Sequence, residues 1–237
     1  MTEEQLKQIR ERERNSHITM YSNLELYKEG SWLGIPIRTV IELFPHFARR
    51  TELRVLDLGC GVGRNCISIA RQFRDIQCVV DCVDILDFSI DKLTEYAKNC
   101  DVSAGIRGTV GSIEEFPIPH DHYDWILAVS SLEHVESQEV FLRKLTEIKE
   151  GIRKNGIVCL VINSNVREFC CSTGCAVPPQ FEVNFPTGEL QTLLELTFAG
   201  WRVIKSTQRE QQYEIPREAG INLLHTTVVT FVAEKTE

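Results

Sequence analysis

Long apolar stretches are missing from this chain of 237 residues. No run approaches the roughly 18 apolar residues that a membrane-spanning helix needs, so we expect no membrane partner. The first residues, Thr2-Glu3-Glu4-Gln5-Leu6-Lys7, are mostly polar and lack the apolar stretch of a secretory signal. We therefore expect a cytoplasmic protein whose nine cysteines are reduced thiols.

Basic residues are also too few for a protein that grips nucleic acid. The chain has 26 Lys and Arg against 34 Asp and Glu, which gives a formal net charge of −8. Binding along a phosphate backbone requires a basic stripe. The short basic clusters, such as Arg49-Arg50 and Arg153-Lys154, stand beside acids. We therefore expect no nucleic-acid partner.

Short apolar strands alternate with helical stretches from Leu53 onward, which predicts parallel βαβ units in an α/β fold. The stretch before the last strand has no helical pattern, and the last strand is rich in β-branched residues. These two strands are expected to form an antiparallel hairpin at the sheet edge. The predicted strands cover residues 55–58, 78–84, 106–110, 123–129, 157–162, 201–206 and 225–233.

Two segments stand outside this alternation. Residues 1–50 combine a polar start with an aromatic stretch, and we expect them to form a cap of N-terminal helices on a main domain of residues 51–237. Residues 163–186 hold three prolines and show no steady period. So long an irregular connection in a compact domain is usually functional, which predicts a lid or substrate loop there.

A glycine-rich turn follows the first predicted strand, in the stretch Asp57-Leu58-Gly59-Cys60-Gly61-Val62-Gly63. A strand, a tight turn and a helix N-terminus place a nucleotide-like ligand at the end of a parallel sheet. The spacing differs from the G-x-G-x-x-G of dinucleotide sites, and Asp57 precedes it. A carboxylate favours a cationic group over a phosphate. S-adenosylmethionine carries an ammonium and a sulfonium and no phosphate, so the stretch favours this ligand.

The same stretch resembles motif I, D-x-G-x-G-x-G, of the class I S-adenosylmethionine-dependent methyltransferases. Gly61-x-Gly63-Arg64-Asn65, the segment 185–190, the segment 200–203 and the segment 230–235 look like parts of the tellurite-resistance (TehB-like) subgroup. The resemblance covers about residues 50 to 235. It implies a Rossmann-like fold with a seven-stranded sheet, S-adenosylmethionine as cofactor with S-adenosylhomocysteine as product, and methyl transfer to a small molecule.

The resemblance and the residues together predict the cofactor site. Asp84 ends the second strand, where a carboxylate can accept hydrogen bonds from both ribose hydroxyls; alternatively, it caps the next helix. Ile85 would lie on the adenine face, and Ser112 stands where the family commonly has an acid at the adenine edge. The predicted cofactor-binding residues are Asp57, Gly59, Cys60, Gly61, Gly63, Asn65, Asp84, Ile85, Ser112, Ile113, Ala128, Val129 and Tyr21.

Catalysis depends on less specific signals. His134 is a candidate general base because its usual pKa lies near neutrality, although it could equally fill a satisfied position behind the site. His17, Tyr21 and Trp32 could close over the sulfonium through cation–π contacts, or anchor the N-terminal helices in the core.

Three thiols, Cys170, Cys171 and Cys175, could bind a soft metalloid. The spacing C-C-x-x-x-C differs from the C-x-x-C of zinc sites, so we expect thiols in a loop and no metal. The Asn/Asp-Pro-Pro-aromatic segment typical of nucleic-acid base methyltransferases is absent after the fourth strand. A peptide or protein amine acceptor, a non-catalytic S-adenosylmethionine-binding regulator and a nicotinamide oxidoreductase remain as alternatives. The acceptor and the oligomeric state are open.

Overall fold

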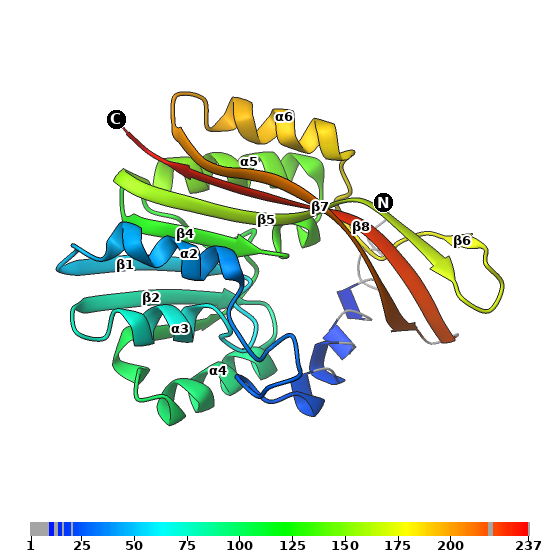
Figure 1. The fold of residues 1–237 in the computed structure, drawn as a ribbon, viewed down its shortest axis with the longest axis horizontal. Coiled ribbons are helices and arrows are strands. Elements are labelled where there is room, and N and C mark those ends of the chain that lie inside the picture. The colour runs from blue at the N-terminus through cyan, green and yellow to red at the C-terminus, as the bar shows by residue number, and fades with distance from the viewer. Residues whose placement is uncertain (1–9, 12–13, 16, 20, 218–219, 237) are drawn as a thin grey trace.

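The computed structural model describes residues 10–11, 14–15, 17–19, 21–217 and 220–236. One mixed sheet runs through the molecule, with helices on both of its faces (Figure 1). The helices are α2 (Arg38–Phe47), α3 (Cys66–Gln72), α4 (Asp87–Asn99), α5 (Gln138–Gly151), α6 (Thr187–Thr197) and the short turns η1 (Ser103–Gly105) and η2 (Leu132–His134). The strands are β1 (Glu52–Leu58), β2 (Gln77–Asp84), β3 (Ile106–Val110), β4 (Tyr123–Val129), β5 (Ile152–Cys170), β6 (Ala176–Val177), β7 (Arg202–Arg217) and β8 (Gly220–Glu234).

The strand order is β3-β2-β1-β4-β5-β8-β7, and the two-residue β6 pairs with β5 outside this path. Strands β1 to β5 are parallel, whereas β8 runs antiparallel to both β5 and β7. This confirms the mostly parallel α/β sheet and its antiparallel hairpin. The chain order reverses at β1, which lies between β2 and β4, and the ends of strands at such a point are where open α/β sheets bind ligands.

Alternating side chains of the strands fill two cores. Val55 packs with α2, α3 and α4 on one face, whereas Leu56 and Leu58 pack with α5 and α6 on the other. The strand period of two thus divides one apolar run between the two layers. Because β1 and β4 carry side chains buried on both faces, they have the continuous apolar sequences typical of central parallel strands.

Strands β5, β7 and β8 are longer than the sequence predicts. We expected β5 to end at residue 162 and an irregular loop to fill 163–186, but β5 continues to Cys170 and pairs with β8 as far as Asn222. Almost all of β7 is exposed or half-buried. Backbone pairing, which leaves no mark in side-chain periodicity, holds these extensions. The irregular part of the predicted lid is therefore confined to the stretch after Cys170, interrupted by β6.

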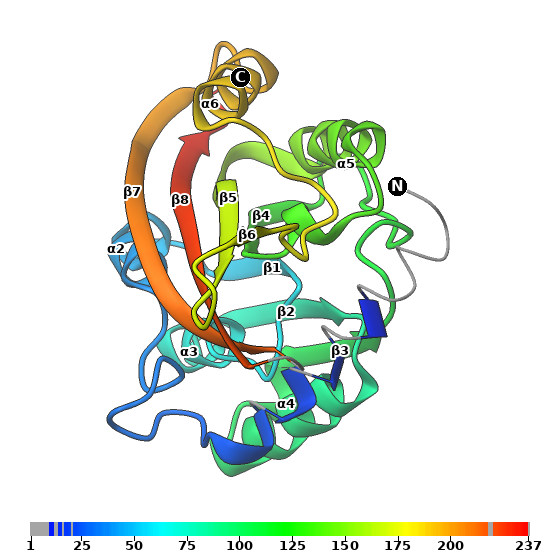
Figure 2. The ribbon, with the colours of Figure 1, turned by 90° about the vertical axis from the view of Figure 1, so that its right-hand side faces the viewer.

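The extended parts of β5, β7 and β8 form, with β6, an arm that projects beyond the carboxyl ends of the parallel strands (Figure 1). In Figure 2 the hairpin of β7 and β8 curves along one side of the molecule. Residues 10–11, 14–15, 17–19 and 21–23 are helical, in agreement with the predicted N-terminal helices. The division of the chain at residue 50 stays a prediction, and residues 1–9 lie outside the described part.

No helix in the described part of the chain is long and apolar enough to cross a membrane.

Candidate functional site

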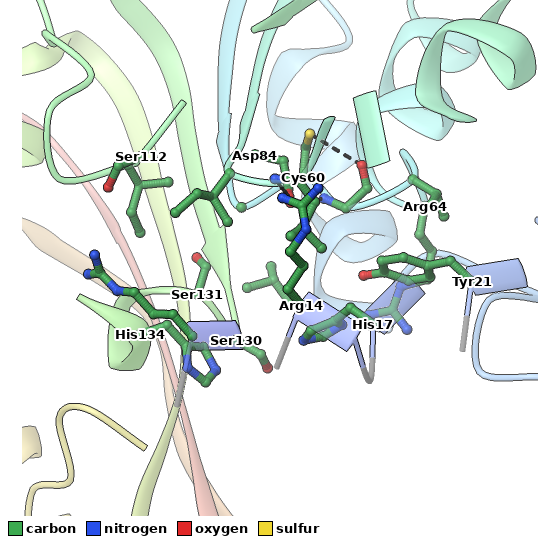
Figure 3. A pocket seen from close by; sticks show the side chains of 18 of the residues that line it. Arg14, His17, Tyr21, Cys60, Arg64, Asp84, Ser112, Ser130, Ser131 and His134 are labelled. Atoms are coloured by element: carbon green, nitrogen blue, oxygen red, sulfur yellow. Dashed lines mark hydrogen bonds between the residues drawn. The ribbon is translucent and has the colours of Figure 1, made fainter. Parts of the chain in front are cut away.

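A cavity of about 910 Å³ lies at the carboxyl ends of β1, β2 and β4. Its size falls within the range of roughly 300 to 1,000 Å³ that is usual for small-molecule sites. Figure 3 shows side chains from the N-terminal helical segment, the β1 and β2 loops and the segment after β4 gathered around this space. The site therefore brings together residues from distant parts of the chain.

The glycine turn after β1 has the backbone geometry that only glycine adopts readily. Gly59, Gly61 and Gly63 have φ angles of 75°, 53° and 98°. A Cβ on Gly59 would stand 2.3 Å from the Cβ of Ser131, and one on Gly61 would stand 2.8 Å from the Tyr21 hydroxyl oxygen. Side chains at these two positions would clash with Ser131 and Tyr21, which line the cavity. Gly63 instead lets the turn pack on Leu93.

Asp84 closes the turn from the end of β2. Its Oδ2 accepts a hydrogen bond from the Gly61 backbone N–H at 2.8 Å, and its Oδ1 accepts one from the Leu86 N–H at 3.0 Å. The carboxylate thus fixes the loop before α4 and lines the cavity, and its contact with a ribose stays a prediction. Burial raises its pKa, although the two backbone donors oppose this shift. Each carboxylate oxygen retains acceptor capacity for a ligand hydroxyl.

Asp57 lies behind the turn and is 1% exposed. Within the described part of the chain, neither of its carboxylate oxygens accepts a hydrogen bond. Burial, followed by the charge of Asp84, raises its pKa to about 7. A buried carboxyl group without a partner is costly, and such groups are typical of functional sites.

Most of the predicted cofactor residues line the cavity, but three do not. Asp57, Gly63 and Ala128 are absent from its described wall, and Ala128 is fully buried in β4. Asn65 lines the wall while its side chain accepts a hydrogen bond from the Ile37 N–H at 3.2 Å. The other predicted residues on the wall are Tyr21, Gly59, Cys60, Gly61, Asp84, Ile85, Ser112, Ile113 and Val129.

Ser112 has a local structural role as well as a place on the wall. Its hydroxyl accepts a hydrogen bond from the Glu114 N–H at 3.1 Å, which is the turn expected if this segment is only a loop. Ile85, in contrast, is 51% exposed at the cavity, as expected for an apolar face that meets a flat ligand.

The aromatic residues of the N-terminal segment form one side of the cavity. The ring centroids of His17 and Tyr21 are 5.6 Å apart, and those of Tyr21 and Trp32 are 6.1 Å apart. The Arg64 guanidinium lies 4.8 Å from the centre of the Trp32 ring. Tyr21 also packs into the core, and its pKa is raised, first by burial and then by Asp84. Tyr21 thus serves both as a core anchor and as part of the cavity wall, whereas Trp32 is 46% exposed and serves only as wall.

The far end of the cavity contains an imidazole held by a buried acid. His134 Nδ1 lies 3.0 Å from Glu182 Oε2, and the ring stacks on Phe181 at 5.2 Å. The Glu182 side chain is only 1% exposed, and the Arg10 Nε lies 3.9 Å from its Oε1. Both His134 and Glu182 line the cavity.

Comparisons with known proteins agree with this arrangement. Residues 55–156 match a family described as a methyltransferase domain. The ubiquinone biosynthesis O-methyltransferase of Rickettsia canadensis is 31% identical over 128 residues, which cover 53% of this chain and 50% of that protein. TehB from Haemophilus influenzae has a TM-score of 0.59 at 21% identity, with coverage of 83% of this chain and 61% of TehB. Over its parallel strands the chain is thus similar to methyltransferases, and it shares their fold.

The similarity to TehB shows a shared methyltransferase fold and agrees with the resemblance seen in the sequence. Another relative, the ajmaline N-methyltransferase of Rauvolfia serpentina, is 26% identical over 105 residues, which cover 44% of this chain and 35% of that protein. The chain spans about a third to a half of the length of these curated relatives.

The residues of this site fit S-adenosylmethionine. The cradle at Gly59 and Gly61 would be filled by a Cβ, and a carboxylate rather than a cation faces it from β2. That donor set suits a ligand with a ribose diol and a positive charge better than a pyrophosphate.

The set of predicted cofactor-binding residues did not include Glu182, Arg10, Ser130 and Ser131, which line the cavity. Ser131 Oγ donates a hydrogen bond to the Leu58 carbonyl at 2.7 Å, and Ser130 has a φ of 51°, which is uncommon for a non-glycine residue. Neither feature leaves a local sequence signal, and Glu182 lies 48 positions from its partner His134. The sequence shows that these residues are Arg, Glu and Ser, but it does not show that they come together at the cavity.

The three clustered cysteines lie outside the cavity. Cys170 ends β5, and Cys171 and Cys175 are exposed in the turn that follows. Among the described residues, no group of three His, Cys, Asp or Glu side chains is arranged to hold a metal ion. The use of these thiols stays a prediction.

Proposed function

We propose that this protein is an S-adenosylmethionine-dependent methyltransferase that acts on a small-molecule acceptor. The observation that carries the proposal is the glycine turn, held by the hydrogen bond from the Gly61 N–H to Asp84, at a cavity of about 910 Å³. The alternation of strands, the family match and the unpaired Asp57 carboxyl group support it.

S-adenosylmethionine, when bound, supplies an electrophilic methyl group on a sulfonium. In this proposal Asp84 accepts hydrogen bonds from the ribose hydroxyls, Ile85 and Ile113 contact the adenine, and Ser112 with its neighbouring backbone meets the adenine edge. The Asp57 carboxylate attracts the ammonium group electrostatically from behind the turn, and Val129 and Ala128 lie beneath the methionine part. The aromatic wall of Tyr21 and Trp32 excludes water and faces the positive sulfur. The cavity orients the acceptor for in-line attack.

A small acceptor fits the site better than a polypeptide. The N-terminal helical segment and the Glu182 loop both contribute to the wall, so these two segments bound the space together with the glycine turn. Transfer to a peptide or protein amine would require a chain to enter between these segments. A nicotinamide oxidoreductase is disfavoured by the glycine spacing. The absence of a nucleic-acid partner and a cytoplasmic location remain predictions.

Isothermal titration calorimetry with S-adenosylmethionine and S-adenosylhomocysteine tests the cofactor. Because charged hydrogen bonds are worth about 1.5–3 kcal/mol, we expect Asp84→Ala to weaken binding by about 10- to 100-fold. Asp91→Asn, which alters an exposed carboxylate on α4, is the matched control and should bind like the wild type. Failure of the wild type to bind either ligand, or unchanged binding by Asp84→Ala, would contradict the proposal. Binding without turnover across the acceptor classes would favour a regulatory module.

A further inference from the structure

A turn in the arm carries the three clustered cysteines, none of which lies on the described wall of the cavity. Cys170 ends β5, and the chain returns as β6, which pairs antiparallel with β5 as far as Phe169 and Ala176. The next pair in this register is Cys170 with Cys175, and the Cys170 N–H donates a hydrogen bond to the Cys175 carbonyl at 2.9 Å. The two cysteines therefore stand directly opposite one another on two antiparallel strands.

This opposed pair has the separation that a disulfide requires. In a hydrogen-bonded antiparallel pair the Cα atoms lie about 5.5 Å apart, within the range of about 4.4–6.8 Å found across disulfides. Directly opposed residues also place their side chains on the same face of the sheet. Both sulfurs accordingly contact the same turn: Cys170 Sγ lies 3.1 Å from Ser172 Oγ, and Cys175 Sγ donates to the Thr173 carbonyl at 3.9 Å. The backbone thus already has the arrangement of a bridged pair.

The third thiol, Cys171, points away from this pair. Its backbone N–H donates to the Ile221 carbonyl on β8 at 3.0 Å, whereas the Cys170 N–H points the other way, toward β6. Backbone groups that point to alternate sides mark an extended chain, in which successive side chains lie on opposite faces. The turn therefore offers two thiols on one face and one on the other. This division agrees with the absence of a metal-binding group among the described residues.

The chemical environment of Cys170 favours its thiolate. Hydrogen bonds from the side chains of Ser172 and then Thr173 lower its pKa to about 7, so about half of this thiol is ionised at neutral pH. Burial has the opposite effect in the core, where it raises the pKa of both Cys60 and Cys159 to about 12. Because oxidants attack accessible thiolates, Cys170 is the cysteine on which oxidation begins.

We propose that Cys170 and Cys175 form a redox-active dithiol, a site of reversible oxidation by hydrogen peroxide that is separate from the proposed methyltransferase site. The Cys170 thiolate attacks one peroxide oxygen, the oxygen–oxygen bond breaks, hydroxide leaves, and the sulfur becomes a sulfenic acid. The Cys175 thiolate then attacks that sulfur, and the sulfur–oxygen bond breaks. The hydroxides take up the protons that the two thiols lose. Two thiols are thus oxidised to one disulfide, one peroxide is reduced to two waters, and an added dithiol reverses the change.

Mass spectrometry tests the bond, because all three cysteines lie in one tryptic peptide, residues 168–202. The folded protein is treated with hydrogen peroxide, then alkylated with iodoacetamide in denaturant and digested. We expect the peptide to lack two hydrogens and to carry one alkyl group, on Cys171; dithiothreitol added after the peroxide should restore three alkyl groups. Cys171→Ser is the matched control and should form the bond like the wild type. Three alkylated cysteines after peroxide, a bond that includes Cys171, or equal oxidation of the buried Cys159 would overturn the proposal.

Single variants separate the roles of the two thiols. Cys175→Ser should leave a sulfenic acid on Cys170 that dimedone traps, because the thiol that would displace it is missing. Cys170→Ser should give neither this adduct nor a disulfide at the turn. In the wild type, disulfide formation should slow about 5-fold between pH 7 and pH 6, because the ionised fraction of a thiol with a pKa of about 7 falls by this factor. A dimedone adduct on Cys171 instead of Cys170, or a rate that does not change between these pH values, would overturn the assignment.

Discussion

Asp57 illustrates how a single residue can oppose stability at this site. Its carboxyl group is buried and accepts no hydrogen bond of normal geometry from a described residue, and the Cys66 backbone N–H opposes the rise in its pKa less than burial and Asp84 cause it. Each pKa unit corresponds to about 1.4 kcal/mol. A pKa of about 7 in place of 3.8 therefore means that ionising Asp57 in the folded protein is unfavourable by roughly 4 kcal/mol. A cationic ligand group would relieve this penalty, which gives a reason for an acid in motif I.

The sign of the resulting pH dependence follows from proton counts. Between pH 3.8 and about 7, the folded chain keeps a proton on Asp57 that the unfolded chain has lost, so this residue makes stability fall as pH rises. We expect Asp57→Asn to raise Tm relative to the wild type at pH 8, and the difference to vanish near pH 4. Thermal unfolding across this range measures it.

Two observations accompany that experiment. The exposed variant Asp91→Asn should follow the wild type at every pH, and Asp57→Asn should bind S-adenosylmethionine less tightly than the wild type. A wild-type protein that is more stable than Asp57→Asn at pH 8 would show that the carboxyl group has a stabilising partner.

At the scale of elements, a buried ion pair fastens the arm. Arg217, at the end of β7, donates hydrogen bonds of 2.8 Å to both oxygens of Glu168 on β5 and one of 2.9 Å to Gln180 in the following loop. Asn222 on β8 adds a fourth bond, to Glu168. Burial alone would raise the pKa of Glu168, but the bonds from Arg217 and Asn222 outweigh it, and the pKa is lowered. These hydrogen bonds thus join three strands to the loop that leads to the His134–Glu182 pair.

Removal of the arginine should loosen the arm. Arg217→Met leaves the Glu168 carboxylate, 1% exposed, without its cation, and breaking a buried pair costs about 3–5 kcal/mol. We expect faster amide hydrogen exchange in residues 167–170 and 222–225, whereas Arg209→Met, at an exposed position on the same strand, should exchange like the wild type.

The pH dependence of that effect has a defined direction. Because the pKa of Glu168 is lowered in the folded protein, its contribution is present above the usual pKa of about 4.5 and is lost as pH falls through the folded value. The difference between wild type and Arg217→Met should therefore shrink in acid. A difference that persists unchanged at low pH would indicate that packing, rather than the ion pair, holds the arm.

At the scale of the whole molecule, the cavity is assembled from segments between Arg10 and Glu182. A ligand that contacts all of them binds only the folded chain and stabilises it by mass action. At about 100 times Kd the gain is roughly 2.7 kcal/mol, which for a chain of this size raises Tm by roughly 5–10 °C. We expect S-adenosylmethionine and S-adenosylhomocysteine to produce this shift in a thermal melt.

The control ligand in this melt is NAD, which shares the adenosine part but carries a pyrophosphate. We expect no shift with NAD, because Asp84 and Asp57 disfavour an anion near the turn. An NAD shift equal to that of S-adenosylmethionine would contradict the assignment of the site and would restore the oxidoreductase alternative.

The sequence by itself determined the parallel strands, the glycine turn and the identity of the residues around Asp84. These features are local: apolar runs of four to eight residues and a fixed glycine spacing follow from backbone geometry within one βα unit. That is why Gly59, Gly61, Asp84 and Ile85 could be assigned to the cavity before the fold was known.

Tertiary structure decided the rest. The extensions of β5, β7 and β8 depend on backbone pairing between distant segments, which side-chain periodicity does not report. The meeting of His134 with Glu182 depends on a loop that strand pairing carries back to η2. Asp57 is buried behind the turn and does not line the cavity wall, which its place in motif I alone does not reveal. Contacts between distant residues thus define the end of the cavity at His134 and Glu182, whereas local sequence defines the end at the glycine turn.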